Sequence, residues 1–147
     1  MTLVKGLEGM REEVRHMTSS LRRGTRANVI ALSGDLGAGK TSFVQMLARE
    51  LGVAETVTSP TFVIERVYVL PKEQGKGFSR LIHIDAYRLE SERELENLGW
   101  KEIISHPENL ILIEWPERAE SLIPPETTRI TFAYVDEQSR DITYGNR

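Results

Sequence analysis

The chain has 147 residues, a formal net charge of −3 and no cysteine, so disulfides, thiolate metal sites and cysteine nucleophiles are excluded. Hydrophobic residues make up 39% and charged residues 28%, the balance of a globular protein with one core, and we predict a single domain over residues 1–147. The net negative charge gives no general attraction to nucleic acid. The apolar runs are too short to cross a bilayer and residues 1–6 lack a signal-peptide core, so we expect a cytoplasmic protein with no membrane partner.

The first half of the chain predicts a helix, a strand and a second helix. Residues 9–23 predict an amphipathic helix, because four apolar residues share one helical face: Met10, Val14, Met17 and Leu21. The arginines at 22, 23 and 26 favour a solvated helix end, with an RNA or partner contact as the alternative. Residues 28–33 are an apolar run of strand length, and residues 42–51 have helical spacing up to Gly52.

Residues 34–41 fit the phosphate-loop pattern of a glycine, four residues, then Gly-Lys and a hydroxyl residue. The glycines let backbone N–H groups curl around an oxyanion, Lys40 adds a positive charge, and the Thr41 hydroxyl is placed to hold Mg²⁺. The alternative, an ordinary glycine turn, is disfavoured by the strand before the loop and the helix after it. We predict nucleotide contacts from Asp35, Leu36, Gly37, Ala38, Gly39, Lys40, Thr41 and Ser42.

The remaining elements alternate strands with short helices. Residues 62–69 and 80–84 predict an antiparallel hairpin around a turn at 71–77. Ser91 and Glu94 form a capping-box pattern that opens a short helix ending at Gly99. The other predicted elements are a helical turn or two at 100–105, a strand at 109–113 buried on both faces, a short helix at 116–122, and a strand at 128–134 that residues 141–144 could pair with.

This order predicts an α/β fold of the P-loop NTPase type. We expect a mostly parallel central sheet with at least one antiparallel hairpin and helices on both faces. Ligands of such sheets bind outside the carboxyl ends of the strands.

Two acidic residues follow predicted strands directly. Asp85 comes after residues 80–84 and Glu114 after residues 110–113, so both would reach Thr41 if their strands neighbour the first. Mg²⁺ prefers oxygen ligands, and a second carboxylate can orient an attacking water, which makes Lys40, Asp85 and Glu114 the catalytic candidates and Thr41, Asp85 and Glu114 the metal candidates. The alternatives are that Asp85 only caps the turn before Tyr87, and that Glu114 is structural.

Other residues carry weaker signals. Thr58, Ser59 and Thr61 lie where P-loop enzymes place a switch-like loop, with a plain Ser-Pro turn as the alternative. His83 alternates with apolar neighbours and is more typical of a packed histidine than of a base. Trp115 follows Glu114 and could report on the nucleotide, or belong to the core or surface. The absence of an Asn-Lys-x-Asp signature favours adenine over guanine.

Four motifs in order resemble the TsaE (YjeE) family, the bacterial P-loop ATPases of the tRNA threonylcarbamoyladenosine pathway. The likeness covers residues 28–118. The motifs are the loop at 34–41, Ser59-Pro60-Thr61-Phe62, His83-Ile84-Asp85-Ala86-Tyr87-Arg88-Leu89 and Glu114-Trp115-Pro116-Glu117.

The resemblance implies an ATP- and Mg²⁺-dependent ATPase that works with the TsaD and TsaB proteins and meets tRNA through their complex. By position match, Thr61 would be the switch-like threonine, Trp115 would lie close to the nucleotide, and Arg140 would match a late arginine near it. The other readings that we consider are a small P-loop kinase and a nucleotide-sensing module without useful turnover. A kinase would need an acceptor pocket and an arginine-rich lid.

Overall fold

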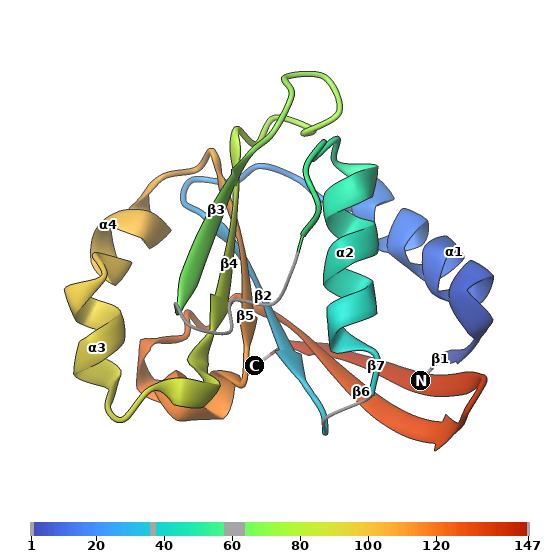
Figure 1. The fold of residues 1–147 in the computed structure, drawn as a ribbon. Coiled ribbons are helices and arrows are strands. Elements are labelled where there is room, and N and C mark those ends of the chain that lie inside the picture. Colours follow the sequence, from blue (N-terminus) through green and yellow to red (C-terminus); the bar gives the residue numbers. More distant parts are fainter. Residues whose placement is uncertain (1, 36–37, 58–63, 147) are drawn as a thin grey trace.

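A seven-stranded sheet with helices on both faces forms the body of the protein (Figure 1). The computed structural model describes residues 2–35, 38–57 and 64–146. The strands are β1 (Thr2–Lys5), β2 (Asn28–Ser33), β3 (Glu65–Val69), β4 (Arg80–Asp85), β5 (Asn109–Glu114), β6 (Thr128–Asp136) and β7 (Ser139–Asn146). The helices are α1 (Gly6–Ser19), α2 (Lys40–Glu50), α3 (Glu92–Asn97) and α4 (Trp100–Ser105), with 3₁₀ turns η1 (Ala86–Arg88) and η2 (Pro116–Leu122).

The sheet order is β1-β7-β6-β2-β5-β4-β3, and its centre is parallel. Strands β6, β2, β5 and β4 run in one direction, whereas β3 and β7 run against their neighbours and β1 pairs antiparallel with β7. The predicted α/β class, mostly parallel sheet and antiparallel β3–β4 hairpin are therefore confirmed.

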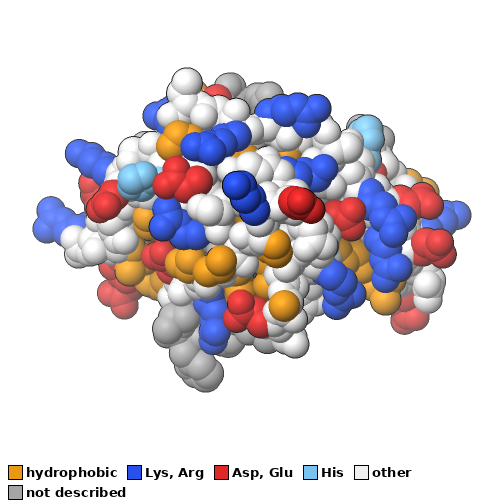
Figure 2. All heavy atoms as spheres, turned by 90° about the horizontal axis from the view of Figure 1, so that it is seen from above, with side chains coloured by type: hydrophobic (Ala, Val, Ile, Leu, Met, Phe, Trp, Pro, Cys, Tyr) orange, Lys and Arg blue, Asp and Glu red, His pale blue; other side chains and the backbone are white. Residues whose placement is uncertain are grey.

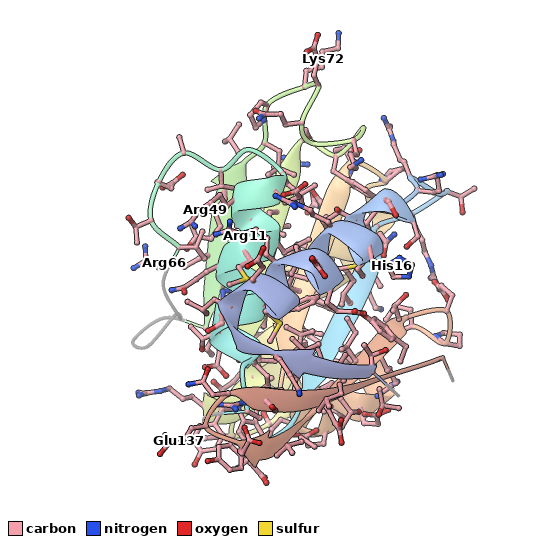
Figure 3. All side chains as sticks on the ribbon, turned by 90° about the vertical axis from the view of Figure 1, so that its right-hand side faces the viewer. Arg11, His16, Arg49, Arg66, Lys72 and Glu137 are labelled. Carbon is pink, nitrogen blue, oxygen red and sulfur yellow. The ribbon has the colours of Figure 1, made fainter. Side chains whose placement is uncertain are left out.

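Apolar residues on the two faces of the sheet build two clusters. Helices α1 and α2 cover one face, where Val14, Phe43 and Leu47 pack against strand residues such as Leu112. The short helices cover the other face, where Leu95 and Trp100 pack against Ile111 and its neighbours. All of β5 is buried, as its unbroken apolar run predicts. Figure 3 shows α1 lying across α2 on the first face.

The first helix differs from its prediction at both ends. It begins at Gly6, where φ is +65°, because β1 occupies the edge of the sheet and the Gly6 N–H donates to the Gln138 carbonyl at 2.6 Å. It ends at Ser19, where hydroxyls bond to carbonyls of the last turn and Arg22 donates to the Ser19 carbonyl at 3.0 Å. No local pattern predicts β1, whose partners lie more than 130 residues along the chain.

Smaller differences concern caps and strand ends. Strands β4 and β5 each extend one residue further than predicted, so Asp85 and Glu114 are their last residues. The capping box is wrong in detail: Ser91 makes no side-chain cap, and Glu94 accepts from the Glu90 N–H at 2.8 Å. Strand β3 begins at Glu65, while residues 62 and 63 of the predicted strand lie outside the described residues.

The end of the molecule that carries the turn at 71–77 displays mixed charges. Figure 2 shows lysine and arginine side chains interspersed with aspartate and glutamate on this face. Arg26, for instance, pairs with Glu126. No helix in the described part of the chain is long and apolar enough to cross a membrane.

Candidate functional site

The segment between β2 and α2 turns sharply at two glycines. Gly34 has φ of +141°, and a Cβ there would lie 2.5 Å from the Phe132 carbonyl oxygen. Gly39 has φ of +101° directly before α2, and a Cβ there would lie 3.2 Å from the Met10 methyl carbon. Both positions therefore need a residue without a side chain, as the phosphate-loop pattern predicts.

Lys40 is buried at the first position of α2, with 5% of its surface exposed. Its ammonium donates to the Gly34 carbonyl and lies 3.9 Å from the centre of the Trp115 ring. Burial lowers the pKa of Lys40, and the negative charges of four acids act against this: Glu114, Glu117, Asp85 and Asp35. The lysine is thus a desolvated cation with carboxylates around it.

Asp85 and Glu114 are register partners at the carboxyl ends of β4 and β5. Burial raises the pKa of Asp85, the Glu114 charge adds to the rise, and a hydrogen bond from the Tyr87 N–H at 3.0 Å opposes it. Asp85 therefore does cap the following turn, the arrangement considered as its structural alternative. The prediction that both acids reach Thr41 assumed that both strands neighbour β2; β5 does so, whereas β4 is one strand further away.

The Glu114 carboxylate is buried against His83. His83 Nε2 lies 2.6 Å from Glu114 Oε2, and the side chains are only 1% and 6% exposed. His83 is packed, as its apolar neighbours predict, but its ring also contacts an acid of the site.

Trp115 turns the chain immediately after β5. Its φ of +58° and ψ of +53° are left-handed, a conformation uncommon for a bulky residue. Its backbone N–H donates to the Leu32 carbonyl at 3.3 Å, and the centre of its ring lies 5.0 Å from that of the Tyr87 ring. The strained backbone places the indole over Lys40.

A cavity of about 180 Å³ opens beside the start of α2. Apolar and polar residues both line it: Val4, Gly6, Leu7, Met10, Gly39, Ser42, Glu137, Gln138 and Arg140. Arg140 donates to the carbonyls of Asp136 and Ser139, and its Cγ lies 3.7 Å from a Cβ built on Gly39. Glu137 marks this end of the molecule in Figure 3, opposite Lys72.

The structure thus brings most of the predicted residues to one end of the sheet. Lys40, Asp85, Glu114 and Trp115 form one group, and Gly39, Ser42 and Arg140 line the neighbouring cavity. The Asp35 carbonyl accepts from the Ala38 N–H at 3.1 Å, and Thr41 is exposed in the first turn of α2. The predicted residues Leu36, Gly37 and Thr61 lie outside the described residues, as do Thr58 and Ser59.

Two further residues, Glu117 and His83, belong to this group. The charge of Glu117 raises the pKa of Lys40, although Glu117 lies three residues beyond the end of β5. Residues 116–122 form η2, which turns the chain back toward the lysine. The contact between His83 and Glu114 needs the register of β4 on β5, which the sequence does not display. The two-residue spacing of His83 and Asp85 on one strand face was the available signal.

The oxygen donors of this end suit a magnesium ion. The described residues contain no cluster of three histidine or acidic side chains that could hold a metal alone. Two carboxylates and a threonine hydroxyl match Mg²⁺, which keeps several waters and takes few protein ligands.

Sequence and structure comparisons with known proteins agree with one another. A family model described as "Threonylcarbamoyl adenosine biosynthesis protein TsaE" matches residues 8–142. The TsaE protein of Bacillus subtilis is 39% identical over 82% of this chain and 72% of its own length, and that of Treponema pallidum is 38% identical over 79% and 80%. The crystal structure of Bacillus subtilis YdiB superposes with a TM-score of 0.71 and 27% identity, covering 99% of this chain and 83% of that one.

Proposed function

The chain belongs to the TsaE family of tRNA threonylcarbamoyladenosine biosynthesis proteins, and on this premise we propose that it binds ATP with Mg²⁺ and hydrolyses it. We further propose that it acts in the cytoplasm with TsaD and TsaB, and meets tRNA through their complex. One observation carries the biochemical proposal: a glycine-bounded turn, a desolvated lysine and two strand-end carboxylates lie together at one end of the sheet.

The phosphates would be held by backbone N–H groups of residues 35–42 and by Lys40. A phosphate oxygen offers Lys40 a counter-charge and replaces the Gly34 carbonyl and the Trp115 ring as its partner. Burying a cation away from water is unfavourable unless an anion pairs with it. A phosphate that binds beside Lys40 is therefore stabilised.

The surrounding charges favour a metal-bound nucleotide over a free one. Four acids act on Lys40, so a polyphosphate alone would enter a negatively charged environment. Thr41, Asp85 and Glu114 would hold Mg²⁺, which when bound neutralises charge on the phosphates. The same two carboxylates would orient the attacking water, and we expect slow turnover until TsaD and TsaB complete the site.

The nucleobase would occupy the cavity beside Gly39. The cavity adjoins the end of the glycine turn and has apolar walls from Val4, Leu7 and Met10, which suit a flat aromatic ring. Arg140 is one of its lining residues.

Two substitutions and one control test the proposal. Lys40→Ala is expected to abolish ATP binding in calorimetry, whereas Glu114→Ala is expected to keep binding and lose phosphate release. Lys101→Ala, an exposed lysine on α4, is the control and should behave like the parent. A Lys40→Ala variant that binds ATP with the parent's affinity would contradict the assignment of the loop.

Phosphate release with and without purified TsaD–TsaB separates the alternatives. We expect release that rises in the presence of the pair. Transfer of phosphate to a small acceptor would instead indicate a kinase, and tight binding without release under either condition would indicate a nucleotide-sensing module.

A further inference from the structure

His83 and Glu114 form a buried polar pair on the face of the sheet that α1 and α2 cover. Both residues are at least nine-tenths buried, and the Nε2–Oε2 distance is 2.6 Å. Such a contact between a ring nitrogen and a carboxylate is a strong hydrogen bond in a region of low dielectric constant.

Strand register explains why these two side chains meet. His83 is paired with Leu112, and Asp85 with Glu114. Because side chains alternate along a strand, all four lie on one face of the sheet. His83 is two residues before Asp85, further from the carboxyl end of β4. Glu114 is then the diagonal neighbour of His83, within reach of a long side chain.

Glu114 can serve the site only as a carboxylate, which accepts hydrogen bonds and cannot donate them. In that form the hydrogen bond requires His83 Nε2–H as the donor. Nδ1 is buried and has no hydrogen-bond partner among the described residues. Glu114 is therefore the one hydrogen-bonded neighbour of the ring in the described part of the chain.

Glu114 faces Lys40 as well as His83. Among the acids whose charges raise the pKa of Lys40, Glu114 contributes most. Its side chain has three rotatable bonds, so an unrestrained carboxylate would sample several positions near the loop. A hydrogen bond that fixes Oε2 also restricts Oε1, because one carbon carries both oxygens.

We propose that His83 is a positioning residue for nucleotide hydrolysis, whose Nε2–H holds the Glu114 carboxylate in its working orientation. The inference rests on the proposed ATPase function. His83 touches neither phosphate nor metal in this arrangement, so its removal should reduce turnover and leave nucleotide binding nearly unchanged. The competing possibility is a merely structural pair, which would affect folding alone.

Two amide substitutions separate these possibilities. The amide nitrogen of glutamine reaches the position of Nε2, whereas that of asparagine ends near Nδ1 and cannot reach Glu114. Lost support for a liganding or reacting side chain typically costs about 10-fold to 100-fold in activity, so we expect His83→Asn to lower kcat by that factor and His83→Gln to stay within about threefold of the parent. The nucleotide Kd of both variants should remain within about threefold of the parent's, since neither change removes a phosphate contact.

A double-mutant cycle and a surface control complete the test. In a Glu114→Gln background, His83→Asn should cause no further loss of kcat, because the carboxylate to be positioned is absent. His106→Asn controls for the histidine-to-asparagine change itself, since the His106 side chain is 44% exposed and its Nδ1, whose position asparagine keeps, lies 3.5 Å from Glu108; it should leave kcat unchanged.

All variants are measured as full chains with Mg-ATP and TsaD–TsaB, after thermal unfolding confirms that they fold. Equal losses in His83→Gln and His83→Asn, parental kcat in His83→Asn, or an undiminished loss in the Glu114→Gln background would each overturn the positioning role while leaving the ATPase proposal intact. A parent chain that releases no phosphate would overturn both.

Discussion

At the scale of single residues, Gly34 gives the clearest dependence on a missing side chain. A Cβ would lie 2.5 Å from a backbone oxygen of β6, which cannot move without breaking the sheet, and φ is +141°. Strain and overlap together should make Gly34→Ala less stable by about 2–4 kcal/mol in urea unfolding. Gly24→Ala is the matched control, because its nearest non-neighbouring atom is 3.9 Å away and no positive φ opposes a side chain; a change within about 0.5 kcal/mol is expected.

Glu65 at the start of β3 predicts a pH-dependent stability. Burial raises its pKa above the ordinary value of 4.5, so the folded chain keeps this proton to higher pH than the unfolded chain. The free energy of unfolding therefore falls as pH rises from about 4.5 through the raised pKa.

Glu65→Gln removes this ionisation. The variant should be more stable than the parent at pH 7, and the difference should vanish near pH 3.5, in urea unfolding at both values. Glu55→Gln, at an exposed position, should change stability by less than about 0.5 kcal/mol at either pH. A constant difference for Glu65→Gln across the range would contradict the assignment.

At the scale of elements, β1 holds α1 against the sheet. Val4 is 4% exposed and packs in the α1–α2 cluster, whereas Leu3, its neighbour on the opposite face, is 52% exposed. Val4→Ala should lower the free energy of unfolding by about 1–3 kcal/mol, because it leaves a cavity in the core. Leu3→Ala on the same strand should cost less than about 0.5 kcal/mol. Similar losses in the two variants would show that strand propensity, rather than burial, determines the effect.

The elements also show what the sequence alone can predict. Strands β2 and β5 and helix α2 can be predicted because their apolar patterns are local. The placement of Asp85 beside Glu114 follows because both end neighbouring parallel strands. Strand β1 has four residues and depends on β7, so no local pattern distinguishes it from a loop. The His83–Glu114 contact likewise depends on register, and the left-handed turn at Trp115 depends on the surrounding packing.

At the scale of the whole molecule, nucleotide binding should stabilise the fold. A ligand at 100 times its Kd adds about 2.7 kcal/mol to the free energy of unfolding, which for a chain of this size raises Tm by about 5–10 °C. We expect this rise with Mg-ATP in thermal unfolding, and its loss in Lys40→Ala. With EDTA the rise should shrink, because the acids around Lys40 then face an uncompensated polyphosphate. An equal rise with and without the metal would contradict that electrostatic argument.

The two tryptophans of the chain pack in the same cluster, on the face of the sheet that the short helices cover, but their surroundings differ, with consequences for spectroscopy. Trp100 is 1% exposed, and its indole N–H donates to the Leu122 carbonyl at 2.9 Å, so its emission should follow global unfolding. Trp115 lies against the Lys40 ammonium, a charge that perturbs indole emission and that a bound phosphate would draw away. A Trp100→Phe chain would therefore carry a single tryptophan, whose emission follows the occupancy of the loop in real time without any attached dye.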